Sequence, residues 1–398
     1  MRQFGLPAMV AVLAVVALLP AAPWSVLAAP TEMGTIKIAT QSPLSGRQAD
    51  LGEGIRNGAQ LAVDQLAGPL TKMGFKVELA PFDDQARPSA GVANAKTLAA
   101  DPDILLVVGH LNSAVAIPSS EVYKDGSLAM ISPANTHPDV TERKITSVFR
   151  VVGRDDVQGT AGAEFAAREL KARSVFIVHD MTAYGRGAAE MLRHHAPRVG
   201  MKVLGFEGRG EKAEFDPIIL AIQGRDPDVI YFGGTYDRAG VFFKQARAKG
   251  LKARFLGPDG MDSSELARMA GDAVVGMHYT AIVGPVLVYR GAAQFTGDYR
   301  AKYRRDPPPF AAQAYDATAI GLAAIARAAT AGGGKKPARG QVTEEIRRTR
   351  GFRGVTGTFA FDAKGDAVPA SYFVLRVVSG NPAKWNDNML VRRLEISP

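Results

Sequence analysis

The chain has 398 residues, of which 46% are hydrophobic and 22% are charged, with 42 glycines, 24 prolines and no cysteine. These proportions exclude a collagen, a coiled coil and a wholly disordered chain. The absence of thiols excludes a disulfide scaffold, a thiol enzyme, an iron–sulfur protein and a zinc site built on thiolates. The net charge is +9 and its positive residues are spread along the chain, so we interpret them as solvated surface rather than a face for an anionic partner such as nucleic acid.

Residues 1–28 predict a secretory signal peptide. Arg2 supplies a positive charge, residues 6–19 form an uncharged apolar run, and Val26-Leu27-Ala28 offers a small-residue cleavage pattern. The alternative is a membrane anchor, but the run of about 14 residues is shorter than the roughly 20 that a spanning helix needs. We therefore expect a soluble, exported protein located in the periplasm.

The next part of the chain alternates strands and helices. Residues 104–108, Ile-Leu-Leu-Val-Val, are typical of a parallel strand buried on both faces. In the helix predicted over 89–100, Ser89 is the expected N-cap. The predicted strands are 35–39, 75–81, 104–108 and 129–131, and the predicted helices are 54–66, 89–100 and 113–123.

The pattern then restarts. The predicted strands are 149–151, 174–178, 202–205, 229–232, 255–256 and 274–278, and the predicted helices are 156–170, 184–195, 215–223 and 237–249. Repeated strand–helix units predict parallel sheets with helices on both faces, and two such runs predict two similar lobes. A domain has about 150 residues on average, so the length of the chain also favours more than one hydrophobic core.

The last third has a different pattern. Helices are predicted at 294–303, 311–329 and 341–348, and the apolar helix 311–329 is expected to pack on an earlier lobe. Residues 356–362 and 372–378 predict antiparallel strands with a turn at 362–365 between them.

Candidate binding residues follow the strands, because ligands of open α/β sheets bind beyond the carboxyl ends of strands. Ser113 lies where the chain passes from a buried strand into a helix, and its hydroxyl and the backbone N–H groups there could bind an anion. The alternative is a simple N-cap serine. Thr136 would lie beside it if the two strands are neighbours, or else its segment is a turn shaped by Pro133 and Asn135. Two hydroxyls with N–H groups could hold a carboxylate without any arginine.

In the second run, the loops 179–185, 233–236 and 257–260 each place an aromatic side chain or a carboxylate at a sheet edge. Asp259 lies between Pro258 and Gly260, so it is either a turn former or a site residue.

Signatures of enzymes and cofactor sites are absent from the sequence. It has no G-x-S-x-G elbow, no Walker A pattern and no histidine pair at H-x-x-x-H spacing. His110 and His179 are interpreted as structural residues. We therefore expect no catalytic activity, no cofactor and no metal site, although an exported α/β enzyme remains an alternative.

Several segments, taken in order, resemble the branched-chain amino acid binding proteins of ABC importers, the Leu/Ile/Val-type family of type I periplasmic binding proteins. The segments are 43–46, 51–52, 82–84, 109–113, 130–134, 178–180, 184–187, 231–234, 245–247, 257–260 and 361–362. The resemblance implies two Rossmann-like lobes joined by three crossovers, with lobe 1 at 35–151 plus 281–360 and lobe 2 at 152–280 plus 361–398.

The resemblance also implies a ligand site in the cleft. Ser113 and Thr136 would hold an α-carboxylate, while the Ala134 carbonyl, the Thr136 hydroxyl and Asp259 would take an α-ammonium. The remaining implied site residues are Leu51, Tyr184, Thr235 and Tyr236. The implied partners are an amino acid or related small molecule and the permease and ATPase of an ABC importer, with the binding protein itself a monomer.

The sequence departs from the family pattern at the side-chain pocket. Asp259 stands where glutamate is common, Leu51 where an aromatic is common and Thr235 where tyrosine is common. Ala86 and Asn112 occupy the places of the cysteines that form a disulfide in many members. The ligand could therefore be another amino acid, an amide or an aromatic acid, and a sensory module of the same fold is the alternative function.

Overall fold

The computed structural model describes residues 33–210, 214–285, 288–289 and 291–396, together with residues 1, 3 and 5. The predicted signal peptide otherwise lies outside the described residues. None of the helices in the described part of the chain is long and apolar enough to cross a membrane.

The first sheet contains five parallel strands in the order β2-β1-β3-β4-β5. They are β1 (Thr35–Ser42), β2 (Lys76–Asp83), β3 (Ile104–Gly109), β4 (Ala129–Ser132) and β5 (Val148–Arg150). The helices packed around it are α1 (Ala49–Leu66), α2 (Gly68–Lys72), α3 (Pro88–Ala100), α4 (Ser113–Asp125), α5 (Asp139–Glu142), α11 (Ala292–Tyr303), α12 (Ala311–Ala331) and α13 (Arg339–Arg347).

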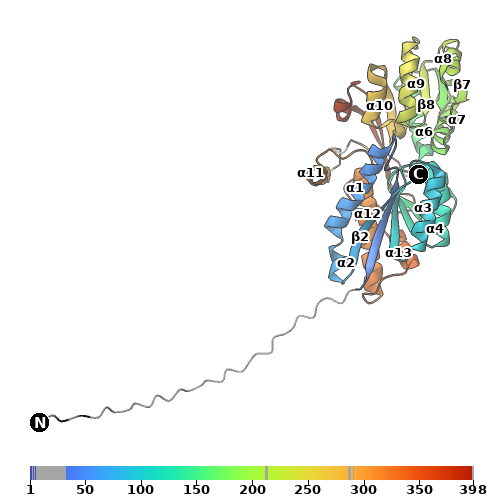
Figure 1. The fold of residues 1–398 in the computed structure, drawn as a ribbon. Helices are drawn as coiled ribbons and strands as arrows, with labels where there is room; N and C mark the ends of the chain where they lie inside the picture. The colour runs from blue at the N-terminus through green and yellow to red at the C-terminus, as the bar shows by residue number, and fades with distance from the viewer. Residues whose placement is uncertain are drawn as a thin grey trace. The chain divides into compact units, whose positions relative to one another are not determined.

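Strand β3 shows why helices cover both faces of this sheet. All of its residues are buried, as the apolar run at 104–108 predicts. Leu106 belongs to the same apolar cluster as Ile320 of α12. Its neighbour Val107 points the other way and belongs to a cluster with Leu98 of α3 and Tyr123 of α4. The expectation that 311–329 packs on an earlier lobe is thus confirmed, and Figure 1 shows α12 beside α1.

The second sheet contains seven strands in the order β14-β13-β10-β9-β8-β6-β7. They are β6 (Ser174–His179), β7 (Lys202–Gly208), β8 (Val229–Gly233), β9 (Arg254–Gly257), β10 (His278–Ala281), β13 (Ala370–Arg376) and β14 (Met389–Ile396). The strands β6 to β10 pair in parallel, whereas β13 pairs antiparallel with both β10 and β14. The helices packed around it are α6 (Asp155–Arg168), α7 (Ala183–His195), α8 (Asp216–Gln223), α9 (Tyr236–Ala248) and α10 (Ser264–Ala270).

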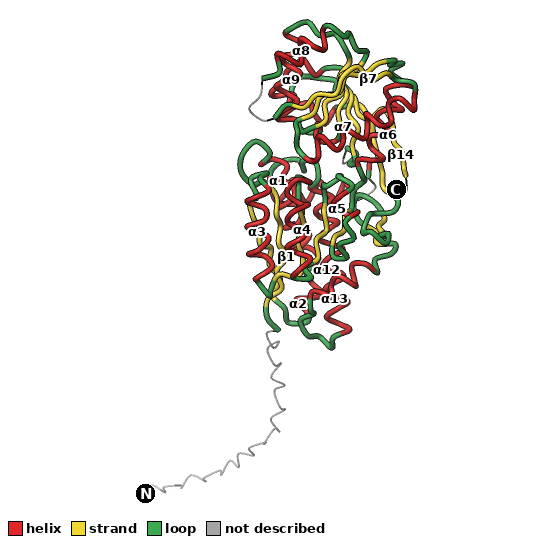
Figure 2. The backbone as a smooth tube through the Cα atoms, turned by 90° about the vertical axis from the view of Figure 1, so that its right-hand side faces the viewer, coloured by secondary structure: helices red, strands yellow, loops and turns green. Residues whose placement is uncertain are grey.

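Two helical layers cover the second sheet. Figure 2 shows α8 and α9 on one side of its twisted strands and α6 and α7 on the other. Phe176 of β6 clusters with Phe242 of α9, while the adjacent Ile177 clusters with Phe165 of α6 and Leu192 of α7. This alternation confirms the prediction of a parallel sheet with helices on both faces.

The chain passes between the elements of the two sheets three times, after β5, after β10 and before β13. Residues Glu32–Pro398 nevertheless form one compact unit. The lobe boundaries at 151, 280 and 360 stay predictions.

Several predicted elements are wrong in detail. Ser89 is not an N-cap: α3 begins at Pro88 after Arg87, because the fixed φ of proline suits the first helical position. The strand predicted over 274–278 is displaced, since Gly271–Val274 is a 3₁₀ turn and Gly276 has a positive φ of 82° before β10 begins.

The C-terminal pairing also differs from the prediction. Only Thr358–Phe359 (β12) of the expected strand 356–362 is extended, and it pairs with Phe352–Arg353 (β11) rather than with β13. The turn at 362–365 is closed by a bridge between Phe361 and Ala367 and by backbone N–H groups that donate to Asp362 Oδ1. The antiparallel partners of β13 are β10 and β14, and the sequence analysis missed β14 altogether.

Candidate functional site

All eight residues predicted to bind a ligand line one pocket between the two sheets: Leu51, Ser113, Ala134, Thr136, Tyr184, Thr235, Tyr236 and Asp259. The sequence analysis did not select the remaining lining residues, which are Gln48, Leu111, Asn112, Gly260 and Phe310. The pocket lies beyond the carboxyl ends of parallel strands, as expected for open α/β sheets. Ligand binding by these residues stays a prediction.

Ser113 is the first residue of α4, where the backbone N–H groups have no partner within the helix. The alternative interpretation of Ser113 as the N-cap is wrong, because Asn112 occupies the N-cap position. Asn112 has an extended backbone there, and its side chain makes no capping hydrogen bond. The strands β3 and β4 are neighbours, so the loop that carries Thr136 lies against Ser113. The Ser113 hydroxyl accepts the N–H of His137 at 3.5 Å. This edge of the pocket therefore presents hydroxyls and N–H groups suited to an anion.

The loop after β4 is held in place by Asn135 and Ser132. The Ser132 hydroxyl accepts the Asn135 N–H at 2.8 Å and donates to its Oδ1 at 2.8 Å. Asn135 also accepts the N–H of His110 and donates to the carbonyl of Leu111. The interpretation of this segment as a turn shaped by Asn135 agrees with these bonds. The same hydrogen bonds connect the loops after β3 and β4. The segment can therefore be a turn and still place Thr136 at the pocket.

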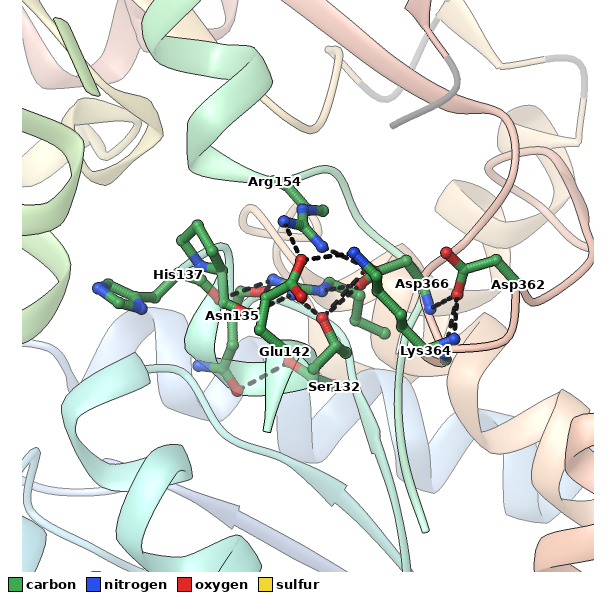
Figure 3. Close-up of polar contacts among 12 residues, drawn as sticks. Ser132, Asn135, His137, Glu142, Arg154, Asp362, Lys364 and Asp366 are labelled. Atoms are coloured by element: carbon green, nitrogen blue, oxygen red, sulfur yellow. Dashed lines mark hydrogen bonds and ion pairs between the residues drawn. The ribbon is translucent and has the colours of Figure 1, made fainter. Parts of the chain in front are cut away.

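A buried ion network supports that loop from behind (Figure 3). Arg150 is fully buried and donates to the carbonyls of Asn135 at 3.0 Å and His137 at 3.1 Å. Its Nε pairs with Asp366 at 2.5 Å, and Arg154 pairs with the same carboxylate at 2.8 Å. Burial opposes ionisation of Asp366, but the two arginines hold its pKa below the usual range. The network joins the segment after β5 to the segment before β13.

Asp259 supplies the negative charge of the pocket. It opens a single 3₁₀ turn, Asp259–Met261, so its backbone does form a turn. Its Oδ1 accepts the hydroxyl of Tyr184 at 2.9 Å and the Nε2 of Gln158 at 2.8 Å. Burial raises the pKa of Asp259 to about 6, although these two donors favour the charged form. The Tyr184 oxygen in turn accepts the N–H of Gly260 at 2.7 Å.

Direct hydrogen bonds join the two walls of the pocket. The Tyr236 hydroxyl donates to the carbonyl of Arg47 at 2.6 Å. Gln48 Nε2 reaches the Thr235 hydroxyl at 3.4 Å, and its Oε1 accepts the Asn112 amide at 2.8 Å. The N-terminal end of α1 therefore touches the N-terminal end of α9 across the pocket.

No group of three or more histidine, aspartate or glutamate side chains in the described ranges is placed to hold a metal ion. His110 is buried between the Asp84 carboxylate and the Tyr123 hydroxyl, with contacts of 3.4 and 3.3 Å. These contacts fit the structural role expected of His110.

Comparison with known proteins decides the family, because a family model described as "Periplasmic binding protein" matches residues 35–382. The chain belongs to this periplasmic binding protein family. The Leu/Ile/Val-binding protein homolog 2 of Brucella abortus (strain 2308) is 33% identical over 361 residues, covering 89% of this chain and 94% of that protein.

Two further relatives agree with this assignment. The leucine-, isoleucine-, valine-, threonine-, and alanine-binding protein of Pseudomonas aeruginosa is 32% identical, covering 83% of this chain and 87% of that protein. The crystal structure of a leucine binding protein from Thermotoga maritima superposes with a TM-score of 0.81 at 28% identity, covering 90% and 98% of the two chains. The predicted resemblance and two-lobe α/β fold are confirmed, and the family consists of binding proteins, not enzymes.

Two departures of this periplasmic binding protein from its family pattern have local explanations. Asn112, at the place of a cysteine, uses its amide to bond Gln48 instead of forming a disulfide. Thr235 is the residue before α9; its hydroxyl donates to the Asp237 carboxylate at 2.6 Å and makes no hydrogen bond to the backbone of the helix. Gln48 itself could have been suspected from the sequence only through its position before an apolar helix.

Proposed function

We propose that this protein captures an amino acid in the pocket and delivers it to an ABC importer. One observation carries the proposal: the pocket sets the hydroxyl of Ser113 and the N-terminus of α4 on one side and the buried carboxylate of Asp259 on the other. An anion-binding edge and an anionic side chain in one small pocket match the two charges of a zwitterion.

In this proposal each polar group of an amino acid has a partner. Ser113 and Thr136 bind the α-carboxylate through hydroxyl and N–H groups. The Ala134 carbonyl, the Thr136 hydroxyl and Asp259 bind the α-ammonium. Tyr184, together with Thr235 and Tyr236, closes over the ligand from the second lobe, as a population shift toward the closed form.

The ligand side chain is proposed to be apolar. Leu51, Leu111 and Phe310 supply apolar side chains to the pocket, which offer no hydrogen bond, while the polar lining residues Gln48 and Asn112 bond to each other. Relatives named for leucine, isoleucine, valine, threonine and alanine support this choice. We further propose export to the periplasm by the N-terminal segment, action as a monomer, and docking of the loaded form on a membrane permease with its ATPase.

A thermal-shift screen tests the proposal. Ligands that bind the folded state raise the melting temperature, so at least one of the twenty amino acids is expected to do so. Amides and aromatic acids in the same screen separate a sensor of those compounds from an amino acid carrier. If no amino acid shifts the melting temperature, the proposal is wrong.

Ser113→Ala tests the carboxylate contact. Loss of one hydrogen bond to a charged group costs roughly 1–3 kcal/mol, so the Kd is expected to rise roughly 5- to 150-fold in calorimetry. Ser119→Ala is the matched control, because Ser119 is a buried serine of the same helix that does not line the pocket. Equal affinities in the two variants would remove Ser113 from the site.

A further inference from the structure

A second carboxylate lies behind the pocket and shares a hydrogen-bond donor with Asp259. Gln158 Nε2 donates to Asp259 Oδ1 at 2.8 Å and to Asp155 Oδ1 at 3.1 Å. Asp155 is fully buried, and its Oδ2 has no hydrogen-bond partner within the described chain. The side-chain amide of Gln158 therefore connects Asp155, the first residue of α6, to Asp259 in the 3₁₀ turn after β9. We call Asp155 and Asp259 the carboxylate pair.

The shared amide can be oriented in one way only. Its Oε1 accepts the backbone N–H of Asp259 at 3.0 Å and the hydroxyl of Thr280 at 2.9 Å. A flipped amide would place its N–H groups against the Asp259 N–H donor, so the observed orientation is fixed. Gln158 therefore gives the carboxylate pair two N–H groups and no positive charge.

No arginine, lysine or histidine of the described ranges forms an ion pair with either member of the carboxylate pair. Two buried carboxylates that share only a neutral donor carry a large desolvation and repulsion cost when both are ionised. That cost is relieved by a proton or by a cation that enters the pocket. Burial and the charge of Asp259 raise the pKa of Asp155, in keeping with this arrangement.

The ionisable groups around the pair come from several elements. Arg150 acts to lower the pKa of Asp155, and Asp262 acts to raise the pKa of Asp259. Three buried tyrosines also face the pair. The negative charge of Asp155, of Asp259 or of both raises the pKa values of Tyr184, Tyr231 and Tyr372. The positive group that acts on Asp155, Arg150, is already paired with Asp366 and forms no ion pair with the carboxylate pair.

Thr136 connects Asp155 to the pocket. The Asp155 backbone N–H donates to the Thr136 carbonyl at 2.9 Å, and interaction with the Thr136 side chain favours the ionised form of Asp155. An ionised carboxylate only accepts hydrogen bonds, so toward Asp155 the Thr136 hydroxyl can act only as a donor. The lone pairs of that hydroxyl are then available to an N–H donor in the pocket, where Thr136 is a lining residue.

We propose that Asp155 determines the specificity of the pocket for a primary ammonium: the carboxylate pair holds one proton while the pocket is empty and releases it to solvent when a ligand ammonium enters. The proposal rests on the proposed function, that the ligand is an amino acid. Asp155 does not line the pocket, so it acts through Thr136 and Gln158 as a positioning residue. The positive charge of the bound ammonium replaces that of the released proton.

The expected selectivity follows from this exchange. An amino acid brings a positive charge and displaces the proton, whereas the corresponding 2-hydroxy acid brings none and leaves the proton in place. The affinity for the amino acid is expected to rise with pH until the pair is ionised in the empty protein, at most about tenfold per pH unit for one released proton. The affinity for the 2-hydroxy acid should not rise in this way.

Isothermal titration calorimetry tests the proposal on the mature protein. The probes are L-leucine, or another amino acid if it gives a larger thermal shift, and the matching 2-hydroxy acid. Titrations in phosphate and Bis-Tris at pH 6, and in phosphate and Tris at pH 8, give the number of protons exchanged. We expect release of about 0.5 to 1 proton per amino acid at pH 6 and less at pH 8.

Asp155→Asn removes the second carboxylate with little change in shape. We expect proton release at pH 6 to fall at least about twofold, and the preference for the amino acid over its 2-hydroxy analogue to fall at least about fivefold. Asp156→Asn is the control, because Asp156 is the next residue of the same helix but pairs with Arg154 at 2.8 Å and is half-buried at the surface. This variant is expected to keep the wild-type values.

Binding of the amino acid without proton release at pH 6 would overturn the inference alone and leave the proposed function intact. Wild-type proton release and selectivity in Asp155→Asn would also overturn it. If that variant does not fold, the wild-type titrations still decide. Absence of binding by any amino acid would overturn both proposals.

Discussion

Replacing Asp259 by asparagine should make the empty protein more stable at neutral pH. Burial raises the pKa of this carboxyl from 3.8 to about 6. Because the folded state holds the proton more tightly than the unfolded state does, the free energy of unfolding falls as the pH rises from about 4 to about 6. Each pKa unit corresponds to about 1.4 kcal/mol, so this raised pKa lowers the free energy of unfolding by about 3 kcal/mol at pH 7 and above, relative to pH 4.

Asparagine carries no charge to desolvate, and its Oδ1 can still accept from Tyr184 and Gln158. Urea unfolding at pH 4 and pH 8 measures the effect. The variant and the wild type should have similar stabilities at pH 4, and the variant should be about 3 kcal/mol more stable at pH 8. The same variant should lose affinity for amino acids. A variant that is less stable than the wild type at pH 8, yet folded, would refute the account of this carboxyl.

Three other substitutions probe the surroundings of the pocket. Asp366→Asn leaves Arg150 buried with a neutral partner and should cost about 3–5 kcal/mol of unfolding free energy in urea titrations; a cost below about 1 kcal/mol would contradict the network's role. In Gly187→Ala the new Cβ would lie 2.6 Å from the His137 ring, where α7 meets the loop after β4, so ligand affinity should fall while the unliganded form widens in X-ray scattering; unchanged affinity would show that the lobes adjust. Tyr184→Phe removes one donor to the pocket carboxylate and should weaken amino acid binding by about 1–2 kcal/mol in calorimetry, with an unchanged Kd as the contrary result.

Most of the eight predicted residues could be placed from the sequence because they follow a strand or begin a helix, whereas Leu51, which lies inside α1, came only from the family resemblance. Chain order and strand–helix alternation predict which loops share a sheet edge, and this is enough to place Ser113 and Thr136 together. The family resemblance then linked these loops to Tyr184 and Asp259 across the two lobes. Spacing alone could not do this, since the lobes pair through space.

The carboxylate pair shows where sequence reasoning stopped. Asp155 and Asp156 look equivalent at the start of a helix, where acidic residues are common for electrostatic reasons. Only their directions differ: Asp156 turns to Arg154, while Asp155 turns inward to Gln158. The pairing of the C-terminal strands was predicted wrongly for a related reason. The strands β13 and β14 are connected through the segment Pro382–Asp387, and no short turn motif in the sequence indicates that they pair.

The ion network around Asp366 bears on how the protein opens. Arg150 and Arg154 bind one carboxylate, so the first and third passages between the sheets are fastened to each other at the same level. The first and third connecting segments should therefore move together, and only the second connecting segment, after β10, can move independently of them. We therefore expect the two lobes to open by rotation about one axis, with little twist between them.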